Sequence, residues 1–470
     1  MKKGIEDFLL RHAATDPVSF HMPGHKGSRI YRENGYGEFL DLLMDCDITE
    51  IPGADNLFRA ESIIAETMEK YRRLYGVKKS YLLVNGSSGG LISSILASVS
   101  RGGSLVMARN CHKSIFNALS LGDIKPVYAY PQTMAEYGIL GEVKAEEIAR
   151  CLDERPDAEA VIVPSPNYYG ICSDIRAIAE EVHSRGKLLI VDQAHGAHLK
   201  LFGSFGIQGF PQSAEEQGAD MVINSIHKTL ASWTQTAILN VCSERVDLNM
   251  LEDSLQMIES SSPSYPMMAT LDINAELLCS KGGELMRQWS EGIDFFYEQA
   301  KKIKGLVLME SESLDRTKLN IDMSAYGIDG NELERLLMEK GIFIELVTGN
   351  IVMCMSGIGN RRSDFERLLE ALQQIAAERS LGPACRRKQP KALTERLKIT
   401  QLPKEKLYVP LSEAENRICA LSIIPYPPGI PIACPGELLS AELLRYVKSC
   451  IDEGEKVIGV TADGKVAVGK

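Results

Sequence analysis

The chain has 470 residues, of which 24% are charged and 44% hydrophobic, and its formal net charge is −11. This length is enough for about three domains with a large buried core, and the acidic balance argues against nucleic acid as a partner. No uninterrupted apolar run approaches the length of a membrane span, so we expect no membrane partner.

The cysteines and the first residues bear on the cellular compartment. The eleven cysteines include no pair at Cys-x-x-Cys spacing, which is typical of reduced, mostly buried thiols rather than of a zinc site or a disulfide framework. The segment from Met1 to Asp7 places acids where a secretory signal needs apolar residues. We therefore expect a cytoplasmic protein without a bound metal.

The first 300 residues divide into two parts. Residues 1–60 are expected to form an N-terminal arm, because their proline and glycine content favours fixed turns over regular structure. In residues 61–300, apolar runs such as 104–108 and 188–191 alternate with helical patterns. Short continuous apolar runs are typical of buried parallel strands, so this part is predicted to be an α/β layered large domain.

The pattern changes after residue 300. Residues 301–380 contain short strand patterns and two helical patterns, which predict a small α+β domain. Residues 381–399 are charged and contain proline, as expected of a linker. Residues 400–470 are predicted to form a C-terminal domain.

Two residues stand out for their chemistry. Asp192 ends the apolar run 187–192, and Lys228 lies in the segment Ser225-Ile-His227-Lys228. The interval between them leaves room for one further loop, helix and strand. An aspartate at the end of a buried strand can keep a proton on a ring nitrogen, and a desolvated lysine is an activated amine nucleophile.

A small-residue segment upstream supplies an anion site. Residues 85–90 follow an apolar run and precede a helical pattern, so free amides at the helix start and the hydroxyls of Ser87 and Ser88 can bind a phosphate. Ser225 and His227 are expected to donate to the same phosphate. No Gly-Lys-Ser/Thr follows, which excludes a nucleotide loop. An acid, an amine and phosphate donors together are the groups that pyridoxal 5'-phosphate (PLP) requires.

Two histidines extend this site. His112 lies about one strand beyond the phosphate segment, where its ring can stack on the cofactor, and His195 follows Asp192 by three residues. Each residue has a plainer explanation when taken alone: Asp192 as a helix cap, Lys228 as a surface lysine, and the histidines as core residues. Their conjunction in one order on an α/β scaffold favours the functional interpretation.

Taken together, the segments resemble the fold-type-I PLP enzymes, and more narrowly the Orn/Lys/Arg decarboxylase family in its short bacterial form. The resemblance covers nearly the whole chain. The segments that carry it are His21-Met-Pro-Gly-His-Lys, Asp47-Ile-Thr-Glu, Asn85-Gly-Ser-Ser, Arg109-Asn-Cys-His-Lys-Ser, Pro166-Asn-Tyr-Tyr-Gly, Asp192-Gln-Ala-His-Gly-Ala-His, Ser225-Ile-His-Lys, Tyr426-Pro-Pro-Gly-Ile-Pro and Pro435-Gly-Glu.

The resemblance implies a fold and a set of roles. It implies a transferase-like large domain with a mixed, mostly parallel seven-stranded sheet, a small α+β domain and a family C-terminal domain, in at least a homodimer. Lys228 would bond to the cofactor aldehyde, Asp192 would face the pyridine nitrogen, and Lys228 or His195 would return a proton to the substrate. Glu345 would lie near the distal cation of the substrate; the alternative is an outward-facing strand acid. The cofactor-binding residues would be Ser87, Ser88, His112, Asp192, Ser225, His227 and Lys228.

The implied reaction is the decarboxylation of a basic L-amino acid with release of CO2, feeding polyamine synthesis. Family analogy ranks arginine (to agmatine) first, lysine (to cadaverine) second and ornithine (to putrescine) third.

Two alternatives stay open. An aminotransferase, or another fold-type-I enzyme, usually holds the α-carboxylate with an arginine on a small-domain strand. Met353 takes that place here, although Arg361 and Arg362 lie close to it in the sequence. The second alternative is a catalytically silent relative that acts as a binding protein, and the retention of Lys228 and Asp192 argues against it.

Overall fold

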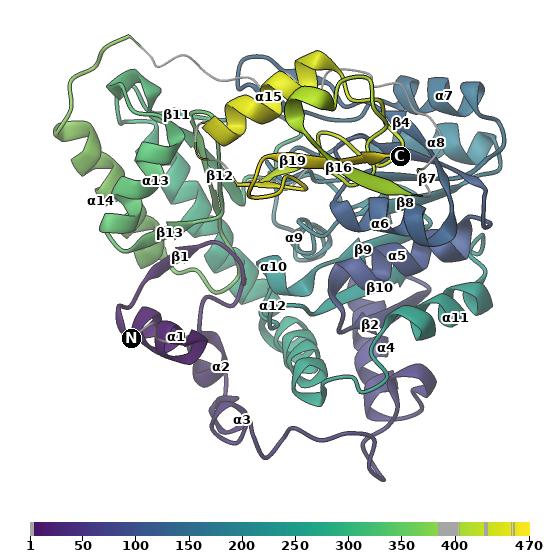
Figure 1. The fold of residues 1–470 in the computed structure, drawn as a ribbon. Coiled ribbons are helices and arrows are strands. Elements are labelled where there is room, and N and C mark those ends of the chain that lie inside the picture. Colours follow the sequence, from purple (N-terminus) through teal and green to yellow (C-terminus); the bar gives the residue numbers. More distant parts are fainter. Residues whose placement is uncertain (1–3, 384–402, 404, 427–430, 453, 455) are drawn as a thin grey trace.

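The computed structural model describes residues 4–383, 403, 405–426, 431–452, 454 and 456–470. In Figure 1 the small domain lies beside the large domain, the N-terminal arm runs beneath both, and the C-terminal segment crosses the top. Among the described residues, no helix combines the length and the apolar character needed to cross a membrane.

The large domain is built on one seven-stranded sheet. Only β10 runs antiparallel to its neighbours, and the other pairings are parallel. This confirms the predicted mixed, mostly parallel sheet. In spatial order the strands are β2 (Lys79–Leu83), β10 (Ala237–Val241), β9 (Met221–Asn224), β8 (Leu188–Asp192), β7 (Ala158–Pro164), β3 (Ser104–Ala108) and β4 (Lys125–Ala129).

Helices cover both faces of this sheet. On β2 and β10 successive side chains alternate between two apolar clusters, so Leu82 and Ile238 pack into one cluster while Leu83 and Leu239 pack into the other. The helices of this part are α4 (Ile63–Tyr75), α5 (Gly86–Ser98), α6 (Lys113–Gly122), α7 (Ala145–Glu154), α8 (Ile175–Ser184), α9 (Leu199–Ser204), α10 (Ile226–Thr229), α11 (Leu248–Ile258) and α12 (Tyr265–Ala300), with a short hairpin of β5 (Thr133–Met134) and β6 (Ile139–Leu140).

The small domain has a four-stranded antiparallel sheet backed by two helices. Its strand order is β11 (Val307–Leu308), β12 (Lys318–Asp322), β15 (Ile351–Met355) and β14 (Leu346–Thr348), and its helices are α13 (Gly330–Glu339) and α14 (Arg362–Ala377). The long helix α12 packs against both α4 and α14. Trp289 on α12 is buried in the same apolar cluster as Phe365 on α14, so one core is continuous between the two domains.

The N-terminal arm is more regular than its proline and glycine content suggested. It contains α1 (Ile5–Ala14), β1 (Val18–Phe20), α2 (Arg29–Glu33) and α3 (Gly37–Asp41). Strand β1 pairs in parallel with β13 (Ile342–Ile344) of the small domain. No residue of α1 is buried, although it carries four large apolar side chains.

The C-terminal segment forms two small antiparallel pairs and one helix around its own apolar cluster. The elements are β16 (Lys406–Pro410), β17 (Ile424–Tyr426), α15 (Ala441–Asp452), β18 (Lys456–Ile458) and β19 (Lys465–Gly469). Of the predicted linker, residues 384–399 lie outside the described residues, as do residues 427–430 of the Tyr426 motif.

The C-terminal domain is tied to the large domain by a buried ion pair. Arg109, which directly follows β3, donates from Nε and Nη2 to the two carboxylate oxygens of Glu437, at 3.2 and 3.1 Å. It also donates to the carbonyl oxygens of Pro431 (2.5 Å) and Ile432 (3.1 Å). Because Arg109 and Glu437 are 3% and 0% exposed, this contact is sealed from solvent.

Candidate active site

The predicted acid and amine come from the ends of adjacent parallel strands. Asp192 is the last residue of β8, and Lys228 lies in α10, which directly follows β9. In an open α/β sheet, loops at the carboxyl ends of such strands meet over the same edge. Burial raises the pKa of the Asp192 carboxyl, while the positive charge of Lys228 opposes that rise. The two side chains therefore lie at the same edge of the sheet, within electrostatic reach of each other.

Lys228 is in direct contact with His195. Its Nζ lies 2.9 Å from Nε2 of His195, and burial is the main cause that lowers the pKa of the amine. Burial also holds the pKa of His195 well below its usual value, so its ring is neutral. A neutral ring that accepts from Lys228 carries its proton on Nδ1, and this buried atom has no partner among the described residues.

The residues that are predicted to bind the phosphate come from two segments of the chain. Ser87 and Ser88 lie in the first turn of α5, and the hydroxyl of Ser225 donates to that of Ser87 at 2.8 Å. Gly86 begins this helix with a φ of 74°, a left-handed conformation that favours glycine. His227 is engaged on one side, because its Nδ1 lies 2.8 Å from the carbonyl oxygen of Thr236. Its predicted contact with the phosphate stays a prediction.

His112 is the N-cap residue of α6, and its Nδ1 accepts from the backbone amide of Ser114 at 3.3 Å. Burial, with smaller contributions from the charges of Lys228 and Lys113, lowers the pKa of His112 to about 3. The ring is therefore neutral and within electrostatic reach of Lys228. Its stacking role stays a prediction.

Backbone hydrogen bonds connect the arm and the small domain to the residues on either side of Lys228. The amide of Gly24 donates to the carbonyl of His227 (2.7 Å), and the amide of Ile358 donates to that of Thr229 (2.9 Å). The amide of Gly359 donates to the carbonyl of Gly24 (3.0 Å). A Cβ on Gly24 would lie 2.4 Å from the carbonyl carbon of Thr229, so only glycine fits there.

Glu345 lies between β13 and β14 and is half-buried, with its Oε2 accepting from the amide of Met22 at 2.9 Å. Its negative charge raises the pKa of Lys228, which places the carboxylate within electrostatic reach of that amine. This position suits the predicted contact with a cationic substrate group.

The arginines that kept an aminotransferase open lie on the surface. Arg361 pairs with Glu33 and is 45% exposed, while Arg362 pairs with Glu366 and is 53% exposed. Met353, in contrast, is fully buried on β15 in an apolar cluster.

Sequence reasoning missed a charged cluster beneath His195. Lys318, Asp315 and His198 are each fully buried, and Lys318 and His198 both pair with Asp315. His198 ends the segment that begins at Asp192, but Asp315 and Lys318 lie at the start of a strand pattern, where charged residues ordinarily indicate a solvated turn.

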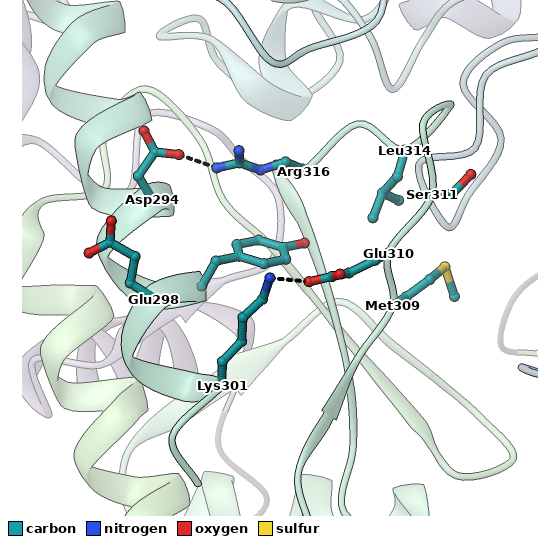
Figure 2. Close-up of a pocket in the computed structure, with 9 residues that line it drawn as sticks. Asp294, Glu298, Lys301, Met309, Glu310, Ser311, Leu314 and Arg316 are labelled. Atoms are coloured by element: carbon teal, nitrogen blue, oxygen red, sulfur yellow. Dashed lines mark hydrogen bonds and ion pairs between the residues drawn. The ribbon is translucent and has the colours of Figure 1, made fainter.

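A separate pocket of about 450 Å³ lies between α12 and the segment 309–316 and contains none of the predicted site residues. Figure 2 shows that four of its charged side chains form two pairs, Lys301 with Glu310 and Arg316 with Asp294.

The chain resembles known decarboxylases in sequence. The family model described as "Orn/Lys/Arg decarboxylase, major domain" matches residues 5–320, and "Orn/Lys/Arg decarboxylase, C-terminal domain" matches residues 386–464. An arginine decarboxylase of Bacillus subtilis (strain 168) is 31% identical over 467 residues, covering 96% of this chain and 94% of that protein. One of Halalkalibacterium halodurans is 30% identical over 472 residues, covering 97% and 94%.

Among solved structures, the Francisella novicida lysine decarboxylase aligns with a TM-score of 0.77 at 19% identity, covering 95% of this chain and 78% of that one. This likeness shows that the fold is shared. The matched residues of the two family models span both the large domain and the C-terminal domain. The chain therefore belongs to the Orn/Lys/Arg decarboxylase family.

Proposed function

We propose that this protein is a PLP-dependent decarboxylase of basic L-amino acids, with arginine as the first substrate to test, then lysine and then ornithine. The observation that carries the proposal is the contact of 2.9 Å between Lys228 Nζ and His195 Nε2, beside the buried carboxylate of Asp192. Family membership supports the reaction, and the printed names of the bacterial relatives support arginine.

Buried polar groups among the described residues support a PLP site. Asp192 is buried, yet among the described residues no lysine, arginine or histidine forms an ion pair with it, so its carboxylate suits a protonated pyridine nitrogen. Nδ1 of His195 and Oδ1 of Asn110 are buried without partners among those residues. Unsatisfied polar atoms of this kind are rare in folded proteins and are consistent with a ligand site.

When bound, PLP supplies an electron sink for the bonding pair left at Cα as CO2 departs. Lys228, with its pKa lowered by burial, would present its amine to the cofactor aldehyde. Its contact with His195 gives two groups able to return a proton to Cα. Ser87, Ser88, Ser225 and His227 would hold the phosphate, and His112 would stack on the ring.

The surroundings favour decarboxylation over transamination. Arg361 and Arg362 are exposed and paired with other carboxylates, so neither is free to hold a substrate α-carboxylate. Met353 is an apolar residue on the strand where an aminotransferase would present its arginine. Apolar surroundings desolvate a carboxylate, which disfavours its charged state and promotes its loss as CO2.

Glu345 is the proposed partner of the distal cation of the substrate, because its carboxylate is half-buried and within electrostatic reach of Lys228. A homodimer, or a higher homo-oligomer, is also part of the proposal. The apolar side chains of α1 support it, since they are all more than half exposed: Ile5, Phe8, Leu9 and Leu10. The product amine would enter polyamine synthesis.

The test is a panel of arginine, lysine and ornithine supplied to the PLP-loaded protein, with CO2, amine and α-keto acid measured separately. We expect CO2 and the matching amine from wild type, and neither from Lys228→Ala. The exposed Lys302→Ala serves as the lysine control and should behave as wild type. Keto-acid formation without CO2 would establish an aminotransferase instead, and wild-type protein inert toward all three substrates would refute the proposal.

A further inference from the structure

The cluster of Asp315, Thr317, Lys318 and His198, the Asp315 cluster, ties three segments around the candidate site. Lys318 Nζ donates to Asp315 Oδ2 (2.5 Å), to Thr317 Oγ1 (3.1 Å) and to the carbonyl oxygen of His195. An ammonium has three hydrogens, so every one of them is used. The third bond fixes the backbone of the residue that contacts Lys228.

Asp315 extends the connection to the other side of the site. Its Oδ2 also pairs with His198 Nε2 at 3.0 Å, and His198 Nδ1 lies 3.1 Å from the hydroxyl of Thr229, the residue after Lys228. A single chain of polar contacts thus runs from the His195 carbonyl through Lys318, Asp315 and His198 to Thr229.

The segment that carries Asp315 is anchored from its outer side as well. The guanidinium of Arg316 lies 5.1 Å from the ring of Tyr297 and 5.7 Å from that of Phe210, and it pairs with Asp294 at the pocket of Figure 2. The backbone amide of Asp315 donates to the carbonyl of Gly170 at 2.8 Å. Asp315 is therefore held both by its backbone and through its neighbour.

Stability alone is a poor reason to bury these charges. Lys318, Asp315, Thr317 and His198 are all 0% exposed. Taking an ammonium and a carboxylate out of water carries a large desolvation cost, and well-packed apolar residues often stabilise a fold equally well. An apolar residue at 318 would, however, leave the carbonyl of His195 without its donor.

We propose that Lys318 and Asp315 are positioning residues that hold His195 and Lys228 in register with each other, so that Nζ of Lys228 and Nε2 of His195 stay in contact where the proton is transferred. This inference rests on the proposed function of Lys228 and His195. The cation of Lys318 also lowers the pKa of both groups, in line with its place beside them. Neither residue would touch the substrate, since each acts through His195 or Thr229.

Lys318→Met is the principal test, because methionine retains an apolar chain of similar length and lacks the three donors. Asp315→Asn removes the charge and keeps the shape. Asp220→Asn is the matched control: Asp220 is also fully buried and pairs with a histidine, His183 at 2.8 Å, but it precedes β9 at the opposite edge of the sheet.

With the PLP-loaded protein, we expect Lys318→Met and Asp315→Asn to lower kcat by about ten- to a hundredfold, with KM changed only a few-fold. The absorbance maximum of the bound cofactor should also shift in both variants. Asp220→Asn should keep the kcat and the spectrum of wild type. An unchanged kcat and spectrum in Lys318→Met, or an equal loss in Asp220→Asn, would overturn the inference.

A second readout needs no activity and separates this inference from the proposed function. In the protein as purified, Lys318→Met should accelerate amide hydrogen exchange in residues 193–198 while residues 104–108 of β3 exchange at the wild-type rate. Equal rates in residues 193–198 of wild type and variant would refute the positioning role whatever the enzyme does. If Lys318→Met does not fold, the double variant Lys318→Met/Asp315→Leu, which removes both charges, takes its place in each measurement.

Discussion

Replacing Glu437 by alanine is expected to loosen the C-terminal domain from the large domain. The substitution removes both carboxylate contacts of Arg109 and the bond of 2.7 Å that Glu437 Oε2 accepts from the amide of Cys434. It leaves a guanidinium that is 3% exposed with only two carbonyl partners, Pro431 and Ile432. Removing one partner of a buried ion pair destabilises a fold by about 3–5 kcal/mol.

Hydrogen exchange measures this loss where it occurs. If the domain opens locally, amides of β19 should exchange roughly 10²- to 10⁴-fold faster in Glu437→Ala than in wild type. Those of β8, the middle strand of the large sheet, should change much less. The assay needs no assumption that the whole chain unfolds in one step.

Two controls decide whether the buried charge is the cause. Glu339→Ala breaks the exposed pair with Arg335, whose side chains are 57% and 52% exposed, and should cost less than about 1 kcal/mol. Arg109→Met/Glu437→Leu removes both charges and should recover most of the lost protection. An exchange rate for Glu437→Ala within about threefold of wild type would refute the reasoning.

Three further predictions concern other parts of the molecule. Burial raises the pKa of Glu259 from 4.5 to about 7, so its stabilising effect is complete below pH 4.5 and is lost as the pH rises through 7. Between pH 5 and 8, the free energy of unfolding of wild type, measured by urea denaturation, should fall by about 2–3 kcal/mol relative to that of Glu259→Gln. If the free energies of both proteins changed with pH in parallel, this prediction would be contradicted. Gly24→Ala places a Cβ 2.4 Å from the Thr229 carbonyl carbon and should destabilise the fold by about 1–3 kcal/mol. Gly4→Ala is its control in thermal melts, because a Cβ at Gly4 would have nothing within 4 Å. Equal melting temperatures of the two variants would count against the packing argument. Tyr75→Phe removes a buried hydrogen bond of 2.6 Å to the carbonyl of Ala197 and should lower the free energy of unfolding by about 1–2 kcal/mol. Tyr408 is 48% exposed, so Tyr408→Phe should leave the stability unchanged. A larger loss for Tyr408→Phe than for Tyr75→Phe would show that burial does not strengthen this hydrogen bond.

The large domain was predictable because its strands are short apolar runs. The run 104–108 coincides with β3, and the run 188–191 lies within β8. Ala237–Val241 was not recognised as β10, because the polar Asn240 interrupts its apolar residues. Its antiparallel direction could not be read from the sequence either. The length of α12 was also missed. Gly282 ordinarily indicates a break, yet here it makes room for the ring of Phe205, which a Cβ would approach to 2.5 Å.

The same contrast holds for the site. Asp192 and Lys228 were recognisable because each follows an apolar strand, and the structure places them at the ends of neighbouring strands. Lys318 was not, because a lysine at the start of a strand usually faces water. Only tertiary packing brings Asp315 and the His195 carbonyl to it. Glu345 was assigned to one strand pattern, but it marks the point where the chain leaves β13 and enters β14 in a different sheet.

The meeting of Gly24, Thr229 and Ile358 constrains how the enzyme can move. Main-chain bonds join the arm, the segment after Lys228 and the segment after β15 at one point. A hinge that swung the small domain outward would have to break these bonds or move the segment of Lys228 along with it. Opening and closing around a substrate must therefore pivot at this junction or take place in loops elsewhere, while the amine itself remains stationary.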